Sequence, residues 1–151
     1  MVVATDAESQ ARRTNWAGNL TYGAERLLAP VTIEDAQEAV RAAGKLRALG
    51  SRHCFNDIAD TTGTHLSLHR LNRMVSLDKA RNRVTVEGGI RYGELGPQLH
   101  DAGYALHNLA SLPHISIAGA CATARTGGST SGPTATRCRS SWRSPAWTTG
   151  S

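Results

Sequence analysis

The sequence has few of the residues on which small extracellular domains and metal-binding modules depend. Its 151 residues include only three cysteines, Cys54, Cys121 and Cys138, and no two of them form a C-x-x-C pair. The odd number and the wide spacing argue against a disulfide scaffold and against a structural zinc site. Such cysteine usage is typical of a reducing compartment, so we expect a cytoplasmic protein without a bound metal.

Long apolar runs and a leader-like start are also missing. No apolar run in the sequence approaches the roughly 18 residues that a membrane-spanning helix needs. The first residues, Met1 to Asp6, contain no basic stretch followed by an apolar one, so they do not resemble a signal peptide. We therefore expect no membrane partner.

A strong charge of one sign is absent from most of the chain. The net charge is +5, but the segment 125–151 holds four arginines and no acidic residue. Without that segment the chain has 13 basic and 12 acidic residues, a net charge of +1. The four arginines are separated by Ser, Thr, Gly and Pro and form no basic run, so the pattern does not indicate a nucleic-acid partner.

A helix followed by a strand is predicted after Pro30. Thr32 is a good N-cap, and Asp35 stands three residues later, where a capping box usually has Glu or Gln. Gly44 is a natural stop, and the segment 45–49 then resembles a short strand. The apolar residues at helical spacing, which we expect to form the buried face, are Ile33, Ala36, Ala39, Val40 and Ala43.

The other predicted elements alternate between strand and helix, as in an α+β domain. They are strands at 64–68, 74–78 and 83–87, a helix at 91–102 that stops at Gly103, and an extended segment at 104–106. The second and third strands predict a hairpin, whereas Pro97 weakens the helix because it lacks a donor N–H. Near the start, 15–19 has the composition of a compact loop that Trp16 could anchor by burying its ring.

The segment 49–59 contains the first group of residues suited to chemistry. A strand leads into Gly50-Ser51, and such a loop can present successive N–H groups to a phosphate. His53 follows directly and could act as a ligand, a base or a nucleophile. From the residues alone, a purely structural role for this histidine stays open.

The segment 110–119 contains the second group. Ser111 and Ser116 supply hydroxyl groups, and Gly119 allows a ligand to approach the backbone closely. The same composition would suit a tightly packed loop at the start of a buried helix. The residues by themselves predict an α+β domain with a candidate phosphate-binding loop.

Four separate strings of the sequence, taken together, resemble a known family. They are Asn15-Trp-Ala-Gly-Asn19, Leu49-Gly-Ser-Arg-His-Cys-Phe-Asn-Asp57, Gly88-Gly-Ile-Arg-Tyr-Gly-Glu-Leu95 and Asn108-Leu-Ala-Ser-Leu-Pro-His-Ile-Ser-Ile-Ala-Gly119. Their order and spacing resemble the alditol (xylitol) oxidases, which belong to the vanillyl-alcohol-oxidase-like flavoproteins and have the sugar-1,4-lactone oxidases as close relatives. The resemblance covers residues 14 to 124.

The resemblance implies an α+β fold, namely the N-terminal part of a two-lobed PCMH-type FAD-binding domain, with FAD between the lobes. His53 matches the histidine that is bonded covalently to the 8α carbon of the flavin. The implied FAD contacts are Ala48, Leu49, Gly50, Ser51, Arg52, His53 and Cys54 in the first segment, and Ser111, Ser116, Gly119 and Thr123 in the second. Two of these depart from the family pattern, because Arg52 stands for Gly and Cys54 for Ser.

The resemblance also implies an activity. The family oxidises a terminal alcohol of a polyol, passes hydride to the flavin and returns the electrons to oxygen as hydrogen peroxide. The groups that activate the alcohol belong to a substrate domain that this chain lacks, so no catalytic residue is assigned and we expect an inactive fragment. The alternatives are an arabinono- or gulono-1,4-lactone oxidase-like flavoprotein, or a non-catalytic remnant that binds flavin or a partner.

The sequence changes character at Ala124, where the family pattern would continue Gly-Thr-His-Gly-Ser-Gly. Deleting one nucleotide from codons for that pattern gives Ala-Arg-Thr, as found at 124–126. We expect residues 1–13 to be disordered, 14–124 to form a partial FAD-binding domain, and 125–151 to be a frame-shifted, disordered tail. A genuine Ser/Thr/Gly/Pro-rich linker is the alternative for the tail.

Overall fold

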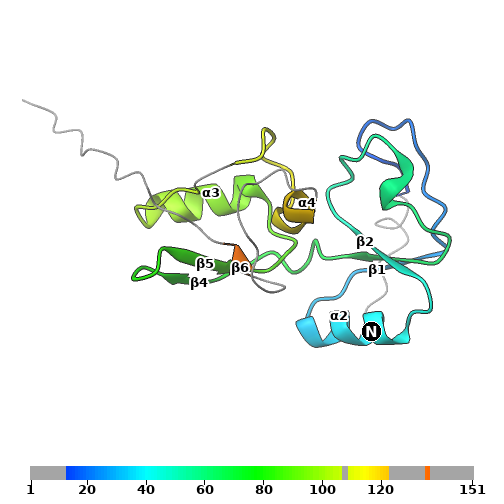
Figure 1. The fold of residues 1–151 in the computed structure, drawn as a ribbon, viewed down its shortest axis with the longest axis horizontal. Helices are drawn as coiled ribbons and strands as arrows, with labels where there is room; N and C mark the ends of the chain where they lie inside the picture. Colours follow the sequence, from blue (N-terminus) through cyan, green and yellow to red (C-terminus); the bar gives the residue numbers. More distant parts are fainter. Residues whose placement is uncertain (1–12, 107–108, 123–134, 137–151) are drawn as a thin grey trace, which may run out of the picture.

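The chain folds into two lobes, each built on one small β-sheet (Figure 1). The computed structural model describes residues 13–106, 109–122 and 135–136. The elements of the first lobe are β1 (Arg26–Leu28), α2 (Ile33–Ala42), β2 (Leu46–Leu49), the 3-10 turn η1 (Asp57–Ala59) and β3 (Thr64–Ser67). Those of the second are β4 (Met74–Asp78), β5 (Arg83–Val86), α3 (Tyr92–Asp101), α4 (Ile117–Ala122) and β6 (Ala135–Thr136). This is the α+β class that the sequence predicts.

The first lobe contains a parallel sheet with strand order β1-β3-β2. Successive residues of a strand point to opposite faces, so Leu27 and Leu28 of β1 enter different clusters. Leu27 packs with Tyr22 and Leu49, whereas Leu28 packs with Leu66 and with Ala39 of α2. The crossover helix α2 therefore covers one face of the sheet (Figure 1).

Helix α2 begins as its sequence predicts, but its buried face is narrower than predicted. The hydroxyl of Thr32 accepts a hydrogen bond from the N–H of Asp35 at 3.0 Å. Ala39 is buried, whereas Ile33 and Val40 are 47% and 54% exposed, so their assignment to the buried face is wrong. The reason is that α2 contacts the sheet at Leu28 and Leu66 through a single small residue.

The second lobe has an antiparallel sheet with strand order β4-β5-β6, which confirms the predicted hairpin. Its core is the larger one. The buried residues of this cluster are Val84, Val86, Ile90, Tyr92, Leu95, Leu99, Ile115, Ile117 and Ala120. Helix α3 contributes Leu95 and Leu99, both without exposed surface, and continues through Pro97. Because Pro97 is on the exposed side, its missing donor is tolerated there.

The carboxylate of Glu87 links the end of β5 to the segment that precedes β4. Glu87 is buried, and its side chain accepts hydrogen bonds from the backbone N–H of Arg73 and, at 2.8 Å, from the guanidinium of Arg73. These hydrogen bonds outweigh the effect of burial and lower the pKa of Glu87 below its ordinary value. The segment before β4 is thereby fixed to the end of β5.

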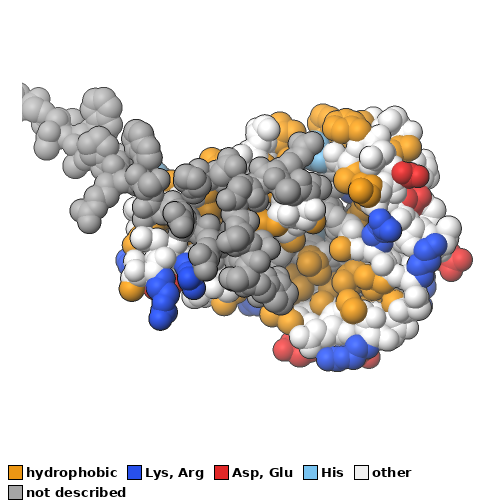
Figure 2. Space-filling model, viewed as in Figure 1, with side chains coloured by type: hydrophobic (Ala, Val, Ile, Leu, Met, Phe, Trp, Pro, Cys, Tyr) orange, Lys and Arg blue, Asp and Glu red, His pale blue; other side chains and the backbone are white. Residues whose placement is uncertain are grey.

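The remaining expectations have mixed outcomes. The segment 104–106 lies outside any strand, and β1 was not predicted at all. The tail lies outside the described residues apart from β6, which pairs with β5. None of the helices in the described ranges is long and apolar enough to cross a bilayer. On the face shown in Figure 2, basic and acidic side chains are interspersed over the first lobe, in keeping with its small net charge.

Candidate functional site

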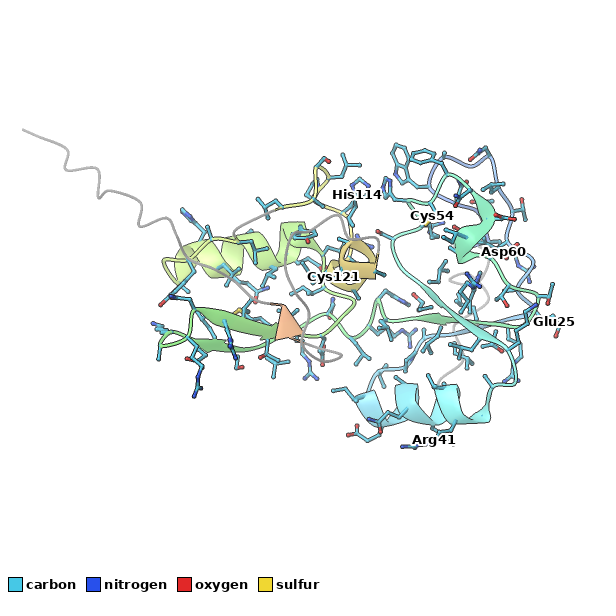
Figure 3. The ribbon with its side chains drawn as sticks, viewed as in Figure 1. Glu25, Arg41, Cys54, Asp60, His114 and Cys121 are labelled. Carbon is cyan, nitrogen blue, oxygen red and sulfur yellow. The ribbon has the colours of Figure 1, made fainter. Side chains whose placement is uncertain are left out.

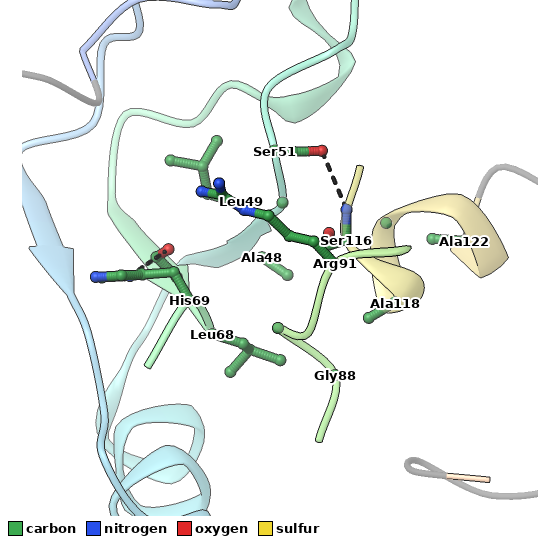
Figure 4. Close-up of a pocket in the computed structure, with 14 residues that line it drawn as sticks. Ala48, Leu49, Ser51, Leu68, His69, Gly88, Arg91, Ser116, Ala118 and Ala122 are labelled. Carbon is green, nitrogen blue, oxygen red and sulfur yellow. Dashed lines mark hydrogen bonds between the residues drawn. The ribbon is translucent and has the colours of Figure 1, made fainter. Parts of the chain in front are cut away.

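The two segments singled out in the sequence meet at the junction of the lobes. Ser116 donates its backbone N–H to the hydroxyl of Ser51 at 3.4 Å, across 65 positions of sequence (Figure 4). A Cβ atom built on Gly50 would lie 3.6 Å from the Cα of Gly119. The end of β2 and the start of α4 are therefore in direct contact.

A pocket opens at this contact (Figure 4). Its lining comes from four places: the end of β2, the end of β3, the turn between β5 and α3, and α4. The lining residues are Ala48, Leu49, Gly50, Ser51, Ser67, Leu68, His69, Gly88, Gly89, Arg91, Ser116, Ala118, Gly119 and Ala122. Both lobes thus contribute to one concave site, which is where ligand sites occur most often.

The predicted site residues divide into two groups. Those that line the pocket are Ala48, Leu49, Gly50, Ser51, Ser116 and Gly119. Those that do not line it are Arg52, His53, Cys54 and Ser111, while Thr123 lies outside the described residues. The structure therefore brings the first group together in the pocket and does not bring the second group into it.

Sequence reasoning missed the pocket residues of two segments. Ser67, Leu68 and His69 lie at the end of β3, where the hydroxyl of Ser67 is 3.1 Å from Nδ1 of His69. Gly88, Gly89 and Arg91 follow β5, and Ala118 and Ala122 belong to α4. The paired glycines were a usable signal, because small residues after a strand mark a close backbone approach.

The polar part of the lining is small and carries no negative charge. It contains one arginine, one histidine and three serines but no carboxylate. Figure 4 shows the side chains of Arg91 and His69 directed towards the same part of the pocket. Most of the pocket surface is apolar, and its arginine and three serine hydroxyl groups are the groups that could contact a phosphate.

The hydroxyl of Ser116 is a buried polar group in the lining of the pocket. Ser116 is 7% exposed, and its buried Oγ atom has no hydrogen-bond partner within the described part of the chain. A Cβ atom would lie 2.8 Å from this oxygen if built on Gly119 and 3.2 Å if built on Gly50. The two glycines therefore leave room for the Ser116 hydroxyl itself, which is packed between them at the edge of the pocket.

Arg52, which stands where the family pattern has Gly, has a strained backbone. Its φ is +65°, in the left-handed region that costs a non-glycine residue about 1 kcal/mol. Two hydrogen bonds hold it there: the N–H of Trp16 donates to the carbonyl of Arg52 at 2.9 Å, and the guanidinium donates to the carbonyl of Thr14 at 2.8 Å. The arginine thus fixes the loop before His53 to the N-terminal segment.

We expect Arg52→Gly to be more stable than Arg52→Ala by about 1 kcal/mol, since both lose the guanidinium contact but only glycine relieves the backbone. Denaturant unfolding measures the difference. The control pair is Arg47→Gly and Arg47→Ala in β2. There the alanine variant should be the more stable of the two, because glycine weakens a strand. The same order at both positions would contradict the assignment of strain to Arg52.

Trp16 does not anchor its loop as predicted. Its side chain is 57% exposed, and the buried anchor is Asn15, which is 2% exposed. The Asn15 amide donates to Asn19 at 2.7 Å and to the carbonyl of Cys54 at 3.1 Å. The Trp16 ring instead stacks on His53, with ring centroids 4.7 Å apart. Trp16 therefore belongs to the surroundings of the candidate attachment residue.

Comparison with known proteins shows the family to which the chain belongs. A sequence model described as an FAD binding domain matches residues 24–141. The alditol oxidase of a Streptomyces species is 45% identical over 130 residues, which cover 83% of this chain and 31% of that protein. The L-gulono-1,4-lactone dehydrogenase of Mycobacterium tuberculosis is 35% identical over 118 residues, covering 76% of this chain and 28% of that protein. The chain thus spans about a third of the length of these relatives.

Solved structures share the fold at lower identity. A carbohydrate oxidase from Microdochium nivale superimposes with a TM-score of 0.67 at 21% identity, covering 78% of this chain and 27% of that one. The 6-hydroxy-D-nicotine oxidase from Arthrobacter nicotinovorans gives a TM-score of 0.66 at 21% identity, covering 77% and 26%. The match over most of the chain shows that the protein belongs to the FAD binding domain family of PCMH-type flavoproteins, whose cofactor is FAD.

Proposed function

We propose that the pocket between the lobes binds the diphosphate of FAD. The observation that carries this proposal is the unpartnered Oγ of Ser116, a buried polar atom that lies against Gly50 and Gly119 in the lining of the pocket. The Ser51 hydroxyl and the Arg91 guanidinium stand on the same pocket and supply a donor and a positive charge. A charge-assisted contact to phosphate is stronger than a neutral one, so Arg91 would contribute most to selectivity for the anion.

We also propose that the isoalloxazine ring lies on the His53 side of the pocket and that His53 is its attachment residue. In this arrangement Ala48 to Cys54 follow the cofactor from diphosphate to ring, and Ser111 and Thr123 provide further contacts. The support is the continuity of the loop: Ser51 lines the pocket and His53 stands two residues later, beside His114 of the second segment. When bound, FAD supplies the two-electron chemistry that the chain's own residues lack.

The proposed reaction of the whole protein is oxidation of a polyol CH–OH group with dioxygen as acceptor, giving hydrogen peroxide. This rests on the relative of greatest identity among those given above, an alditol oxidase. A sugar-1,4-lactone is the second candidate substrate, because lactone dehydrogenases and oxidases are also similar to this chain. Peroxide formation from xylitol and from gulono-1,4-lactone, measured on the FAD-loaded chain, distinguishes the two substrates, and peroxide from neither is the result we expect if the chain is an inactive fragment.

FAD binding can be tested independently of turnover. Equilibrium dialysis of the 151-residue chain against FAD, FMN and riboflavin should show tightest binding for FAD, because only FAD carries the full diphosphate. Equal affinity for FAD and riboflavin would contradict the proposed diphosphate site.

Ser116→Ala should separate binding from stability. A buried hydroxyl without a partner costs about 1 to 3 kcal/mol, so removing it should leave the apo chain as stable as before or more stable. The same change should weaken FAD binding by about threefold to tenfold, since one hydrogen bond contributes roughly 1 kcal/mol. Ser76→Ala, on an exposed position of β4, is the control and should change neither quantity. A loss of apo stability with unchanged FAD affinity would mean that Ser116 has a structural role only.

A further inference from the structure

Two imidazole rings lie against each other where the two site segments meet. Nε2 of His53 is hydrogen-bonded to Nε2 of His114, and the ring centroids are 4.4 Å apart. The two residues are 61 positions apart in sequence, so only the fold brings them together. Figure 3 shows His114 at the junction of the lobes, facing the loop that carries Cys54.

The N-terminal segment fixes this pair from one side. The Trp16 ring stacks on both imidazoles, with centroid distances of 4.7 Å to His53 and 6.0 Å to His114. The backbone on either side of His53 is held as well, because the Trp16 N–H donates to the Arg52 carbonyl and the Asn15 amide donates to the Cys54 carbonyl. The orientation of the His53 ring is therefore set by contacts with Trp16 and His114.

The pairing restricts where the proton of His53 resides. A hydrogen bond between two imidazole nitrogens needs one donor and one acceptor, so the facing Nε2 atoms share one proton. The nitrogen that carries the proton in a histidine is set by the hydrogen bonds of the ring. The two residues next to His53 in the sequence, Arg52 and Cys54, are also ionisable. The Arg52 guanidinium donates to the Thr14 carbonyl. Because it shares this proton with His53, His114 is a group placed to influence the tautomer of His53.

Building on the proposed attachment of FAD at His53, we propose that His114 is a positioning residue for that bond. It orients the His53 imidazole and accepts the Nε2 proton as the other ring nitrogen joins the 8α carbon. One C–H bond and one N–H bond break: the carbon-bound proton leaves to solvent and the imidazole proton passes to His114. The two electrons released go by way of the flavin to dioxygen, which takes up two protons and forms hydrogen peroxide.

The test compares the wild-type chain with His114→Phe, His114→Gln and the control His100→Phe, an exposed position of α3. Each apo chain is incubated with FAD in air. Flavin that stays with the acid-precipitated chain measures the covalent bond, and dialysis measures non-covalent binding. We expect His114→Phe to slow bond formation by at least about tenfold, as loss of a proton acceptor does, while FAD affinity changes by less than roughly threefold. His114→Gln should recover part of the rate because its amide oxygen still orients His53, and His100→Phe should match wild type.

A second readout needs no cofactor. Nitrogen-15 NMR of the apo chain reports the tautomer of His53, which should change in His114→Phe and persist in His100→Phe. An unchanged tautomer, or covalent flavin formed by His114→Phe at the wild-type rate, would overturn the inference while leaving the FAD site intact. Absence of FAD binding in every chain, wild type included, would overturn the proposed function. Wild-type chain that binds FAD without forming the bond would overturn attachment at His53 and the role of His114 together.

Discussion

Gly89→Ala should prevent the chain from folding. A Cβ atom at this position would lie 1.8 Å from the carbonyl oxygen of Leu68 and 2.8 Å from that of Leu71. Both obstacles are backbone atoms that are themselves fixed, since Leu71 donates its N–H to Leu68 at 2.8 Å and Gly89 donates to Leu71 at 2.9 Å. Neither can move without breaking the turn that joins the two lobes.

The expected cost of this single methyl group exceeds about 4 kcal/mol, which is a large part of the 5 to 15 kcal/mol that stabilises an ordinary domain. Soluble yield, far-ultraviolet circular dichroism and denaturant unfolding measure it. The result should be an unfolded or insoluble chain rather than a folded chain with lower FAD affinity.

Alanine substitutions at two other glycines provide controls with smaller expected effects on stability. Gly88→Ala would bring its Cβ to 3.2 Å from the Cβ of Ala118 and 3.3 Å from the side chain of Leu68, contacts that a shift of a few tenths of an ångström relieves, so a smaller loss than for Gly89→Ala is expected. Gly96→Ala lies within α3 with no atom of another segment inside 4 Å, but it directly precedes Pro97, whose ring disfavours a helical residue with a Cβ before it, so we expect little net change in stability. A stably folded Gly89→Ala chain would show that the turn is not as closely packed as described.

The sequence predicted the elements whose local signals were strong. The helix after Thr32 has a cap at one end and a glycine beyond the other, and its bounds were found almost to the residue. Strand β1 was not predicted because a strand of three residues is too short to show an alternating pattern. Local periodicity also misplaced Val40 and Ile33 in the core, because it cannot tell how much sheet a helix has to cover.

The candidate site shows the same division between local and long-range information. Glycine and serine marked the loop at Gly50 and the start of α4 at Gly119, because a close approach of two backbones needs small residues, which are visible in the sequence. The contacts of His53 with Trp16 and His114 depend on segments far apart in the chain, and no spacing in the sequence encodes them. The same holds for Ser67 and His69, whose place in the pocket follows from the pairing of β3 with β2.

Gly119→Val should abolish FAD binding while leaving the chain folded. Its Cβ would lie 2.8 Å from Oγ of Ser116, an oxygen without a partner that can rotate away, and 4.0 Å from the Cα of Gly50. The two further methyl groups would occupy the pocket where the proposed diphosphate lies. The loss of space and the displaced hydroxyl together should lower the affinity for FAD by at least about 100-fold, which corresponds to roughly 2.7 kcal/mol of binding free energy.

Dialysis against FAD and thermal unfolding of the apo chain measure the two effects separately. Ala42→Val, at an exposed position of α2, introduces the same side chain away from the pocket and should leave FAD affinity unchanged. The contrast with Gly89→Ala is physical: the obstacle at Gly89 is fixed backbone, whereas the obstacle at Gly119 is a single rotatable hydroxyl. A Gly119→Val chain that binds FAD like wild type would move the diphosphate out of this pocket, and a chain that fails to fold would assign Gly119 to the packing of α4 against β2.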